Sequence, residues 1–225
     1  IIGDVVIKDG YTLTVTCEVH MSPKGRIIVE RGGKLIVDGG LLTGDCSDMW
    51  KGIVVEGDVP GFQTKSGIVE LKNSAIIENA KDAISMNPTH RPWSDTYQSY
   101  FGGIVRAENS TIRNCHRGVE FMRYGYGGIK DLSFFKNTTF ENLHEGITNW
   151  ANDGVSFDHC TFNKIERRAI HPYDSEVIIK NGTSFVETLI GVDALSTYPI
   201  IFSSIIGTEA PAERNNFNCQ LYGIH

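Results

Sequence analysis

The sequence lacks three features that would assign it to a common class of protein: a long apolar run, an excess of basic residues and a closely spaced cysteine pair. No stretch approaches the roughly 18 consecutive apolar residues of a membrane-spanning helix, and no charged segment leading into an apolar one opens the chain. The net charge of −6 disfavours a nucleic acid or an anionic membrane as the main partner. We therefore expect neither nucleic-acid binding nor membrane insertion.

The five cysteines are odd in number and include no CxxC pair, so they indicate neither a zinc site nor a complete disulfide framework. No metal site is expected on this basis. Cys115 and Cys219 share one place in the repeats described below, where other copies carry apolar residues, and are expected to be buried thiols. Whether Cys17 pairs with Cys46 is left open by the sequence.

A small residue followed by an aliphatic one recurs along the chain, in surroundings typical of β-strands and without any sustained 3.6-residue helical period. The pairs are Gly52-Ile53, Ala83-Ile84, Gly118-Val119, Gly146-Ile147, Ala169-Ile170, Ala194-Leu195 and Gly223-Ile224. Their closest spacing indicates a coil of about 22 residues, with insertions lengthening the other coils.

A second motif, a polar cluster containing asparagine, keeps register with these pairs. The asparagines are Asn73, Asn109, Asn137 and Asn181. Asparagine tolerates the left-handed backbone conformation of a sharp turn, and stacked turns would let neighbouring amides bond one another. Since a third short strand precedes each cluster, the sequence predicts three strands per coil and a solenoid with one continuous apolar interior.

The segments "IIVERGGKLIVDGG", "WKGIVVEGD", "NSAIIENAKDAI" and "NSTIRNCHRGVEF" carry a family resemblance. They resemble the right-handed parallel β-helix superfamily, which has the pectate-lyase-like fold, and in particular the β-helix regions of secreted and cell-surface proteins of Bacteroidetes. The resemblance implies an all-β solenoid covering residues 1–225 as a single domain. It is specific for fold alone, because the superfamily includes lyases, hydrolases, epimerases, adhesins and phage tailspikes.

Side chains two positions before each aliphatic residue should face outward, and their charge alternates from coil to coil. They are Lys51, Asp82, Arg117, Glu145, Arg168 and Asp193. Because coils stack about 4.8 Å apart, opposite charges would meet on neighbouring coils. We interpret the series as a structural ladder of ion pairs that helps to fix the register.

Aromatic residues form the candidate ligand-binding set. Trp150, Tyr173 and Tyr198 lie three positions after consecutive aliphatic residues, on an outward face. The insertions at 87–103 and 123–128 should project from one side of the solenoid and add Trp93, Tyr97, Tyr100, Tyr124 and Tyr126. Such rings suit the apolar faces of sugars, although packing beneath or within loops would explain them equally.

The sequence contains no motif of a known catalytic machinery, including GxSxG, HExxH and the phosphate-binding loops. If the chain were a polysaccharide lyase or glycoside hydrolase, its catalytic residues would be Glu120, Asp95, Arg91 and Arg123, in a cleft under the 87–103 loop. A lyase would add Ca²⁺; otherwise no cofactor is expected.

We therefore expect a non-enzymatic, adhesin-like or stalk-like module, secreted or on the cell surface, that binds a glycan or another surface partner. The carbohydrate-active enzyme is the alternative. The final segment, "NNFNCQLYGIH", begins another copy of the repeat. Since a solenoid end with an unpaired coil is normally capped, we expect further domains of the same polypeptide.

Overall fold

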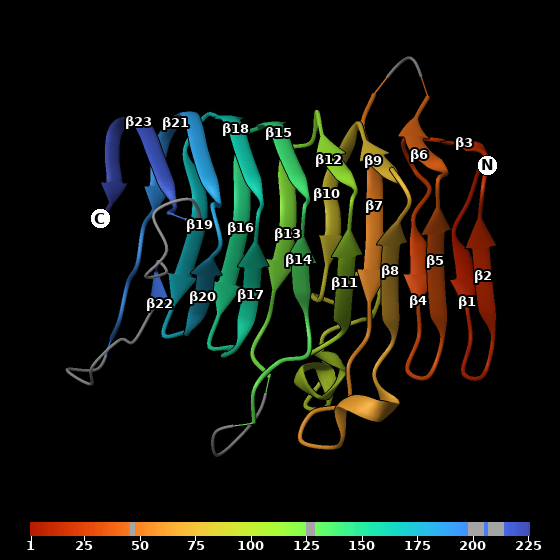
Figure 1. Cartoon of the computed structure of the whole chain (residues 1–225). Coiled ribbons are helices and arrows are strands. Elements are labelled where there is room, and N and C mark those ends of the chain that lie inside the picture. Colours follow the sequence, from red (N-terminus) through yellow and green to blue (C-terminus); the bar gives the residue numbers. More distant parts are fainter. Residues whose placement is uncertain (46–47, 125–128, 198–204, 207–213) are drawn as a thin grey trace.

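The chain winds into a parallel β-helix, seen in a computed structural model that describes residues 1–45, 48–124, 129–197, 205–206 and 214–225. Successive coils stack side by side from one terminus to the other, and every strand pair is parallel (Figure 1). The predicted all-β solenoid is confirmed, and so is the coil length, since Glu141 and Asn163 bond between neighbouring coils at a separation of 22 positions.

Each coil contributes one strand to each of three stacks. The first stack consists of β1 (Val5–Ile7), β4 (Ile27–Val29), β7 (Trp50–Val55), β10 (Ala80–Ser85), β13 (Arg117–Phe121), β16 (Glu145–Trp150) and β19 (Arg168–Tyr173). The second consists of β2 (Thr12–Val15), β5 (Lys34–Asp38), β8 (Ile68–Lys72), β11 (Ile104–Glu108), β14 (Phe134–Lys136), β17 (Val155–Asp158), β20 (Val177–Lys180) and β22 (Ile205–Ile206). The third consists of β3 (Glu18–Met21), β6 (Leu41–Gly44), β9 (Ile76–Glu78), β12 (Thr111–Arg113), β15 (Thr139–Leu143) and β18 (Thr161–Ile165).

Two long strands turn the corner between the third stack and the first. β21 (Ser184–Val192) pairs with β18 through its first half and with β19 through its second half. β23 (Asn216–Ile224) follows β21 along both halves. The first and third stacks are therefore one continuous sheet at this end of the solenoid.

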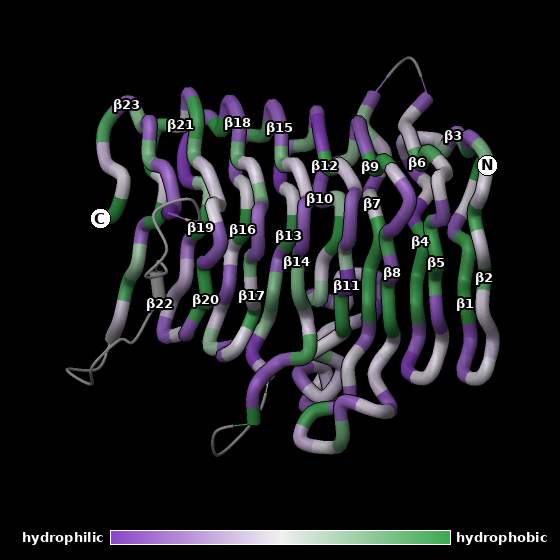
Figure 2. The backbone as a smooth tube through the Cα atoms, viewed as in Figure 1, coloured by the Kyte–Doolittle hydropathy of each residue, from purple (hydrophilic) through white to green (hydrophobic). Residues whose placement is uncertain are grey.

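The interior is filled by side chains of the same kind stacked coil on coil. Hydrophobic residues recur along each strand, and hydrophilic residues gather at the turns (Figure 2). Phe140, Phe162, Phe185 and Phe217 form one column, in which neighbouring ring centroids lie 4.6, 5.1 and 4.6 Å apart and the ring planes are within 8° of parallel. Parallel, in-register pairing places each ring directly over the next, so the register and the packing support each other.

The asparagine turns follow the sequence prediction. Asn73, Asn109, Asn137 and Asn181 have positive φ values of 55°, 48°, 48° and 55°. The amide of Asn137 donates to the side-chain oxygen of Asn109 on the preceding coil at 3.2 Å. These four turns thus use a residue that readily accepts the left-handed conformation, and the Asn137 side chain links two coils.

One predicted repeat is out of register. Ile170 pairs with Val192, which in turn pairs with Ile224, so the inward pair of this coil is Gly191-Val192 and not Ala194-Leu195. Burial identifies Val192 as the inward residue, since Val192 is 1 % exposed whereas Leu195 is 43 % exposed. Asp193 consequently lies one position after the inward residue, not two before it, and Ile190 takes the place predicted for Asp193.

Two loops, each carrying one turn of 3₁₀-helix, extend beyond the same end of the strands (Figure 1). η1 (Gln63–Lys65) follows β7, and η2 (Tyr97–Tyr100) follows β10. Within the described part of the chain, no helix has the length and apolarity needed to span a membrane.

Candidate functional site

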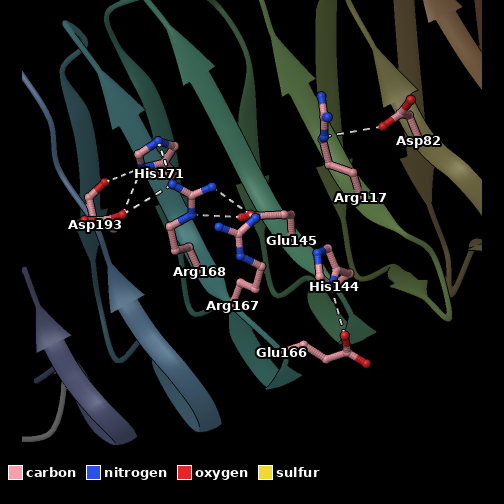
Figure 3. Close-up of polar contacts among 9 residues, drawn as sticks. All are labelled: Asp82, Arg117, His144, Glu145, Glu166, Arg167, Arg168, His171 and Asp193. Atoms are coloured by element: carbon pink, nitrogen blue, oxygen red, sulfur yellow. Dashed lines mark hydrogen bonds and ion pairs between the residues drawn. The ribbon is translucent and has the colours of Figure 1, made fainter.

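The outward side of the first stack carries a group of interacting polar side chains, and we call it the outer face (Figure 3). It is formed by β10, β13, β16, β19 and the last residues of β21. One row of it contains residues that lie opposite one another on successive coils: Ser85, Glu120, Thr148 and His171. Asp193 continues the row, because Ile170 and Val192 are paired.

The first cluster on the outer face is centred on Arg117. The guanidinium bonds Glu120 through Nη1, and its Nε lies 3.4 Å from Asp82 Oδ1. The hydroxyl of Ser85 donates to Glu120 Oε2 at 2.6 Å. Burial raises the pKa of Asp82, and the positive charge of Arg117 opposes that shift only in part. Two carboxyl groups with different surroundings therefore share one guanidinium.

The second cluster is centred on Arg168. Its guanidinium binds both oxygens of Glu145, at 2.7 and 3.2 Å, and lies 3.4 Å from Asp193 Oδ2. Arg167 adds a contact to Glu145 at 2.9 Å. The His171 ring lies 2.7 Å from the Asp193 carbonyl through Nδ1 and 3.0 Å from Arg168 Nη1 through Nε2. Burial lowers the pKa of His171, which agrees with a neutral ring that donates at Nδ1 and accepts from Arg168 at Nε2.

The predicted charge ladder is thus present in part. Asp82 contacts Arg117, and Glu145 pairs with Arg168, as alternation on neighbouring coils predicts. Asp193 also reaches Arg168, but from the neighbouring row because of its corrected register.

An apolar strip borders the second cluster at the carboxyl ends of the strands. Trp150 lies opposite Tyr173 in the strand register, and their ring centroids are 5.0 Å apart with 42° between the planes. Tyr173 is bridged to Leu195 on the next coil. Trp150 is 39 % exposed and Leu195 is 43 % exposed. We call Trp150, Tyr173 and Leu195 the shelf; Tyr198, predicted as its third member, lies outside the described residues.

The 87–103 loop is fastened to the solenoid by a buried carboxylate. Glu56, at the end of β7, is 1 % exposed, and Arg91 binds its two oxygens at 2.5 and 3.0 Å. His90 Nε2 lies 2.9 Å from the same carboxylate. Burial raises the pKa of Glu56, but the hydrogen bonds and charges of His90 and Arg91 outweigh burial and hold that pKa below its usual value.

The 87–103 loop is also held by stacking at Tyr100 and by a small hydrophobic cluster around Tyr97. The Arg31 and Arg91 guanidinium groups lie over the Tyr100 ring, 4.2 and 3.9 Å from its centroid. Tyr97 packs with three other buried side chains, Val59, Phe101 and Tyr124. Trp93 leans on Tyr97 with 4.9 Å between ring centroids, yet it is 77 % exposed. The 87–103 loop is thus packed against the solenoid, and Trp93 is its exposed aromatic residue.

The candidate ligand-binding residues fall into distinct environments. Trp93 and Trp150 present exposed rings, and Tyr173 is partly exposed. Tyr97 and Tyr124 are buried, and Tyr100 lies against two guanidinium groups. Tyr126 lies outside the described residues.

Of the residues named for an enzyme, Arg91 bonds Glu56, whereas Glu120 bonds Arg117 and Ser85. Asp95 and Arg123 are exposed. The sharing of Arg117 by Asp82 and Glu120 was not predicted, although Arg117 lies opposite Asp82 and three residues before Glu120. Glu56 was not predicted as an anchor either, because its position at the end of a strand gives no sign of a partner in an insertion.

Comparison with known proteins identifies no family. No family model and no curated protein matches the sequence. Among solved structures, one similar chain is a protein of Parabacteroides merdae ATCC 43184, provisionally described as a glycosyl hydrolase. It shares 10 % sequence identity, and the match covers 96 % of this chain and 82 % of that chain with a TM-score of 0.17. So low a score carries no conclusion about function.

Proposed function

We propose that the chain is a non-enzymatic glycan-binding module and that its binding site is the shelf beside the Arg168 cluster. The observation that supports this most is the pair Trp150 and Tyr173, which lie in register on adjacent coils with rings partly open to solvent. Aromatic rings that contact each other are normally buried, so this partly exposed pair is the platform for a ligand with apolar faces.

Sugar rings match both the aromatic rings of the shelf and the polar groups at their edges. Their C–H faces pack on aromatic rings, and their hydroxyl groups need hydrogen-bond partners at the ring edges. Asp174 lies directly after Tyr173, and its carboxylate accepts bonds from Thr197 N at 2.7 Å and Thr197 Oγ1 at 2.6 Å. It is an exposed acceptor beside the shelf.

The wider setting belongs to the same proposal. We propose membership of the pectate-lyase-like β-helix superfamily and a secreted or cell-surface location. A rigid solenoid suits an adhesin or a stalk, since it holds a binding face at a fixed position along its length.

The test is a glycan-array screen followed by isothermal titration calorimetry with the best ligand. Trp150→Ala should weaken binding at least tenfold, because stacking on the shelf is lost. Trp93→Ala is the matched control, since it removes an exposed tryptophan from the 87–103 loop. Loss of binding in Trp93→Ala alone would move the site to that loop, and absence of any glycan ligand would refute the proposal.

The second candidate function, glycoside hydrolysis, rests on Asp82 and Glu120. Hydrolases of this kind need one protonated and one ionised carboxyl group on either side of the scissile bond. The raised pKa of Asp82 suits the acid, and Glu120 is held by Arg117 and Ser85. Release of reducing ends from a polysaccharide, abolished in both Asp82→Asn and Glu120→Gln, would establish this function in place of simple binding.

A lyase is the other form of the enzyme alternative, and it would need Ca²⁺. Among the described residues, no group of three or more His, Cys, Asp or Glu side chains is placed to hold a metal ion. A product assay with and without Ca²⁺ tests this form directly.

A further inference from the structure

We infer that the shelf responds to pH, because protonation of His171 separates Trp150 from Tyr173 and so releases the ligand. This inference rests on the proposed function and adds a regulation to the same site. The shelf holds its glycan at neutral pH and loses it at acidic pH.

The His171 ring connects the shelf to the Arg168 cluster. It packs edge-on against Trp150, with 87° between the ring planes and 6.3 Å between the centroids. Its Nε2 lies 3.0 Å from Arg168 Nη1, and its Nδ1 lies 2.7 Å from the Asp193 carbonyl oxygen (Figure 3). Since His171 is only 4 % exposed, its ring changes position only if a neighbour moves too.

A proton on Nε2 turns the contact between His171 and Arg168 from attraction into repulsion. In the neutral ring, Nδ1 carries the hydrogen and Nε2 accepts from Arg168. Protonation replaces this acceptor by a second donor, so two N–H groups and two positive charges face each other across 3.0 Å. The bond to Arg168 therefore breaks when the ring becomes charged.

The groups that face His171 offer no spare negative charge to hold the charged ring in place. They are Arg168 on the same strand, Glu145 on β16, Asp193 after β21 and, in contact with these two carboxylates, Arg167 and His225. Both carboxylates already lie within ion-pair distance of Arg168. Burial lowers the pKa of His171, so the ring is neutral at pH 7 and takes up its proton below the ordinary value of 6.5.

The His171 ring moves when this bond breaks, because Arg168 is held in place. Arg168 binds the two oxygens of Glu145 at 2.7 and 3.2 Å. Trp150, in contrast, is 39 % exposed and has room to turn toward solvent. The charged ring turns away from Arg168 and displaces Trp150, which ends the 5.0 Å contact with Tyr173. The paired surface on which the ligand stacks is then lost.

The first experiment needs no ligand and follows the intact chain by nuclear magnetic resonance from pH 7.5 to pH 4.5. We expect the Trp150 indole signal, identified with Trp150→Phe, to shift with the same midpoint as the His171 ring, below pH 6.5. The shift should disappear in His171→Gln, since an amide both donates and accepts but does not titrate. His225→Gln is the matched control, because it removes the other ring bonded to Asp193 and should keep the shift.

The second experiment repeats the glycan array at pH 7.5 and pH 4.5. Signals present at pH 7.5 should fall at least tenfold at pH 4.5 with the native chain and stay constant with His171→Gln. Equal signals of the native chain at both pH values would overturn the release of the ligand.

The two experiments separate the pH response from the proposed function. A Trp150 signal that is constant with pH, or that shifts equally in His171→Gln, would overturn the role of His171. An array that is empty at both pH values, with a Trp150 signal that follows His171, would refute glycan binding and leave the pH response of the shelf intact.

Discussion

Glu56 and Arg91, 35 positions apart in the sequence, form a two-point ion pair in which the carboxylate is only 1 % exposed. The pair joins the end of a core strand to a long insertion. Removing one partner of such a pair is more damaging than the pair is stabilising, since the other charge stays behind without water.

We therefore expect Arg91→Ala to lower the free energy of unfolding by about 2 to 4 kcal/mol. The measurement is urea denaturation followed by circular dichroism. Glu166→Gln is the control, because that side chain is 68 % exposed in its contact with His144, and no measurable change is expected there. Equal effects of the two substitutions would show that the Glu56 ion pair is not a fastening.

The Glu56 carboxylate should also make the free energy of unfolding depend on pH. Because the pKa of Glu56 is lowered in the folded state, its contribution to stability is present above the ordinary value of 4.5 and is lost as the pH falls below it. The stability difference between the native chain and Glu56→Gln should therefore shrink on acidification from pH 6 to pH 3. A difference that stays constant over this range would contradict the folded-state ion pair.

Asp131 is expected to behave in the opposite way. It is buried, burial raises its pKa, and it accepts hydrogen bonds from Ser133 N at 2.6 Å and Asn152 Nδ2 at 2.8 Å. A raised pKa means that protonation stabilises the fold below about pH 4 and that this contribution disappears as the pH rises.

Asp131→Asn should therefore increase stability at pH 7 and not at pH 3. The neighbouring Asn152 Oδ1 has no hydrogen-bond partner among the described residues, so a turned amide could accept from the new side chain. Thermal unfolding at the two pH values measures the effect. Destabilisation at pH 7 would show that the ionised carboxylate is needed.

Two buried hydroxyl groups provide a matched comparison. Thr148 Oγ1 has no hydrogen-bond partner in the described part of the chain, whereas Ser175 Oγ donates to main-chain oxygens and accepts from Asn152 N at 3.0 Å. Thr148→Val should leave stability unchanged or raise it slightly, because no bond is lost. Ser175→Ala should cost about 1 to 3 kcal/mol, since it strands a buried N–H group. Chemical denaturation of both variants measures the two free energies of unfolding. A loss of stability in Thr148→Val would contradict the expected difference between the two hydroxyl groups.

The phenylalanine column should respond strongly to truncation. Phe162 is fully buried and has a parallel ring on either side, at 4.6 and 5.1 Å. Phe162→Ala is expected to lower the free energy of unfolding by about 3 to 5 kcal/mol. Phe62→Ala, at a side chain that is 72 % exposed, is the control and should have little effect. The measurement is again denaturation in urea, and similar midpoints for the two variants would argue against a continuous core.

The repeats predicted the fold because they impose the same local requirement in each coil. Asn109 and Asn137 must turn the chain, and Val119 and Ile147 must fill the interior, so pattern and structure coincide. The prediction failed at Asp193, where two small-aliphatic pairs stand three residues apart and only packing selects between them.

The site was less predictable, for a related reason. Insertions are free of the repeat, so nothing in the pattern links His90 and Arg91 to Glu56. The position of Trp150 opposite Tyr173 could be predicted because both residues obey the repeat. The spacing places Arg117 near both Asp82 and Glu120, but whether its guanidinium contacts both depends on side-chain direction, which spacing does not specify.

The stacked coils also determine how the molecule would respond to force. Each coil contacts only its neighbours, so tension applied to the two ends would detach coils one after another from an end. A released coil of about 22 residues would lengthen the chain by roughly 70 Å at full extension. The 87–103 loop is bonded to Glu56 through Arg91 and to Arg31 through Ser99 and Tyr100, so it links its own coil to the two preceding coils and would act there as a mechanical clamp.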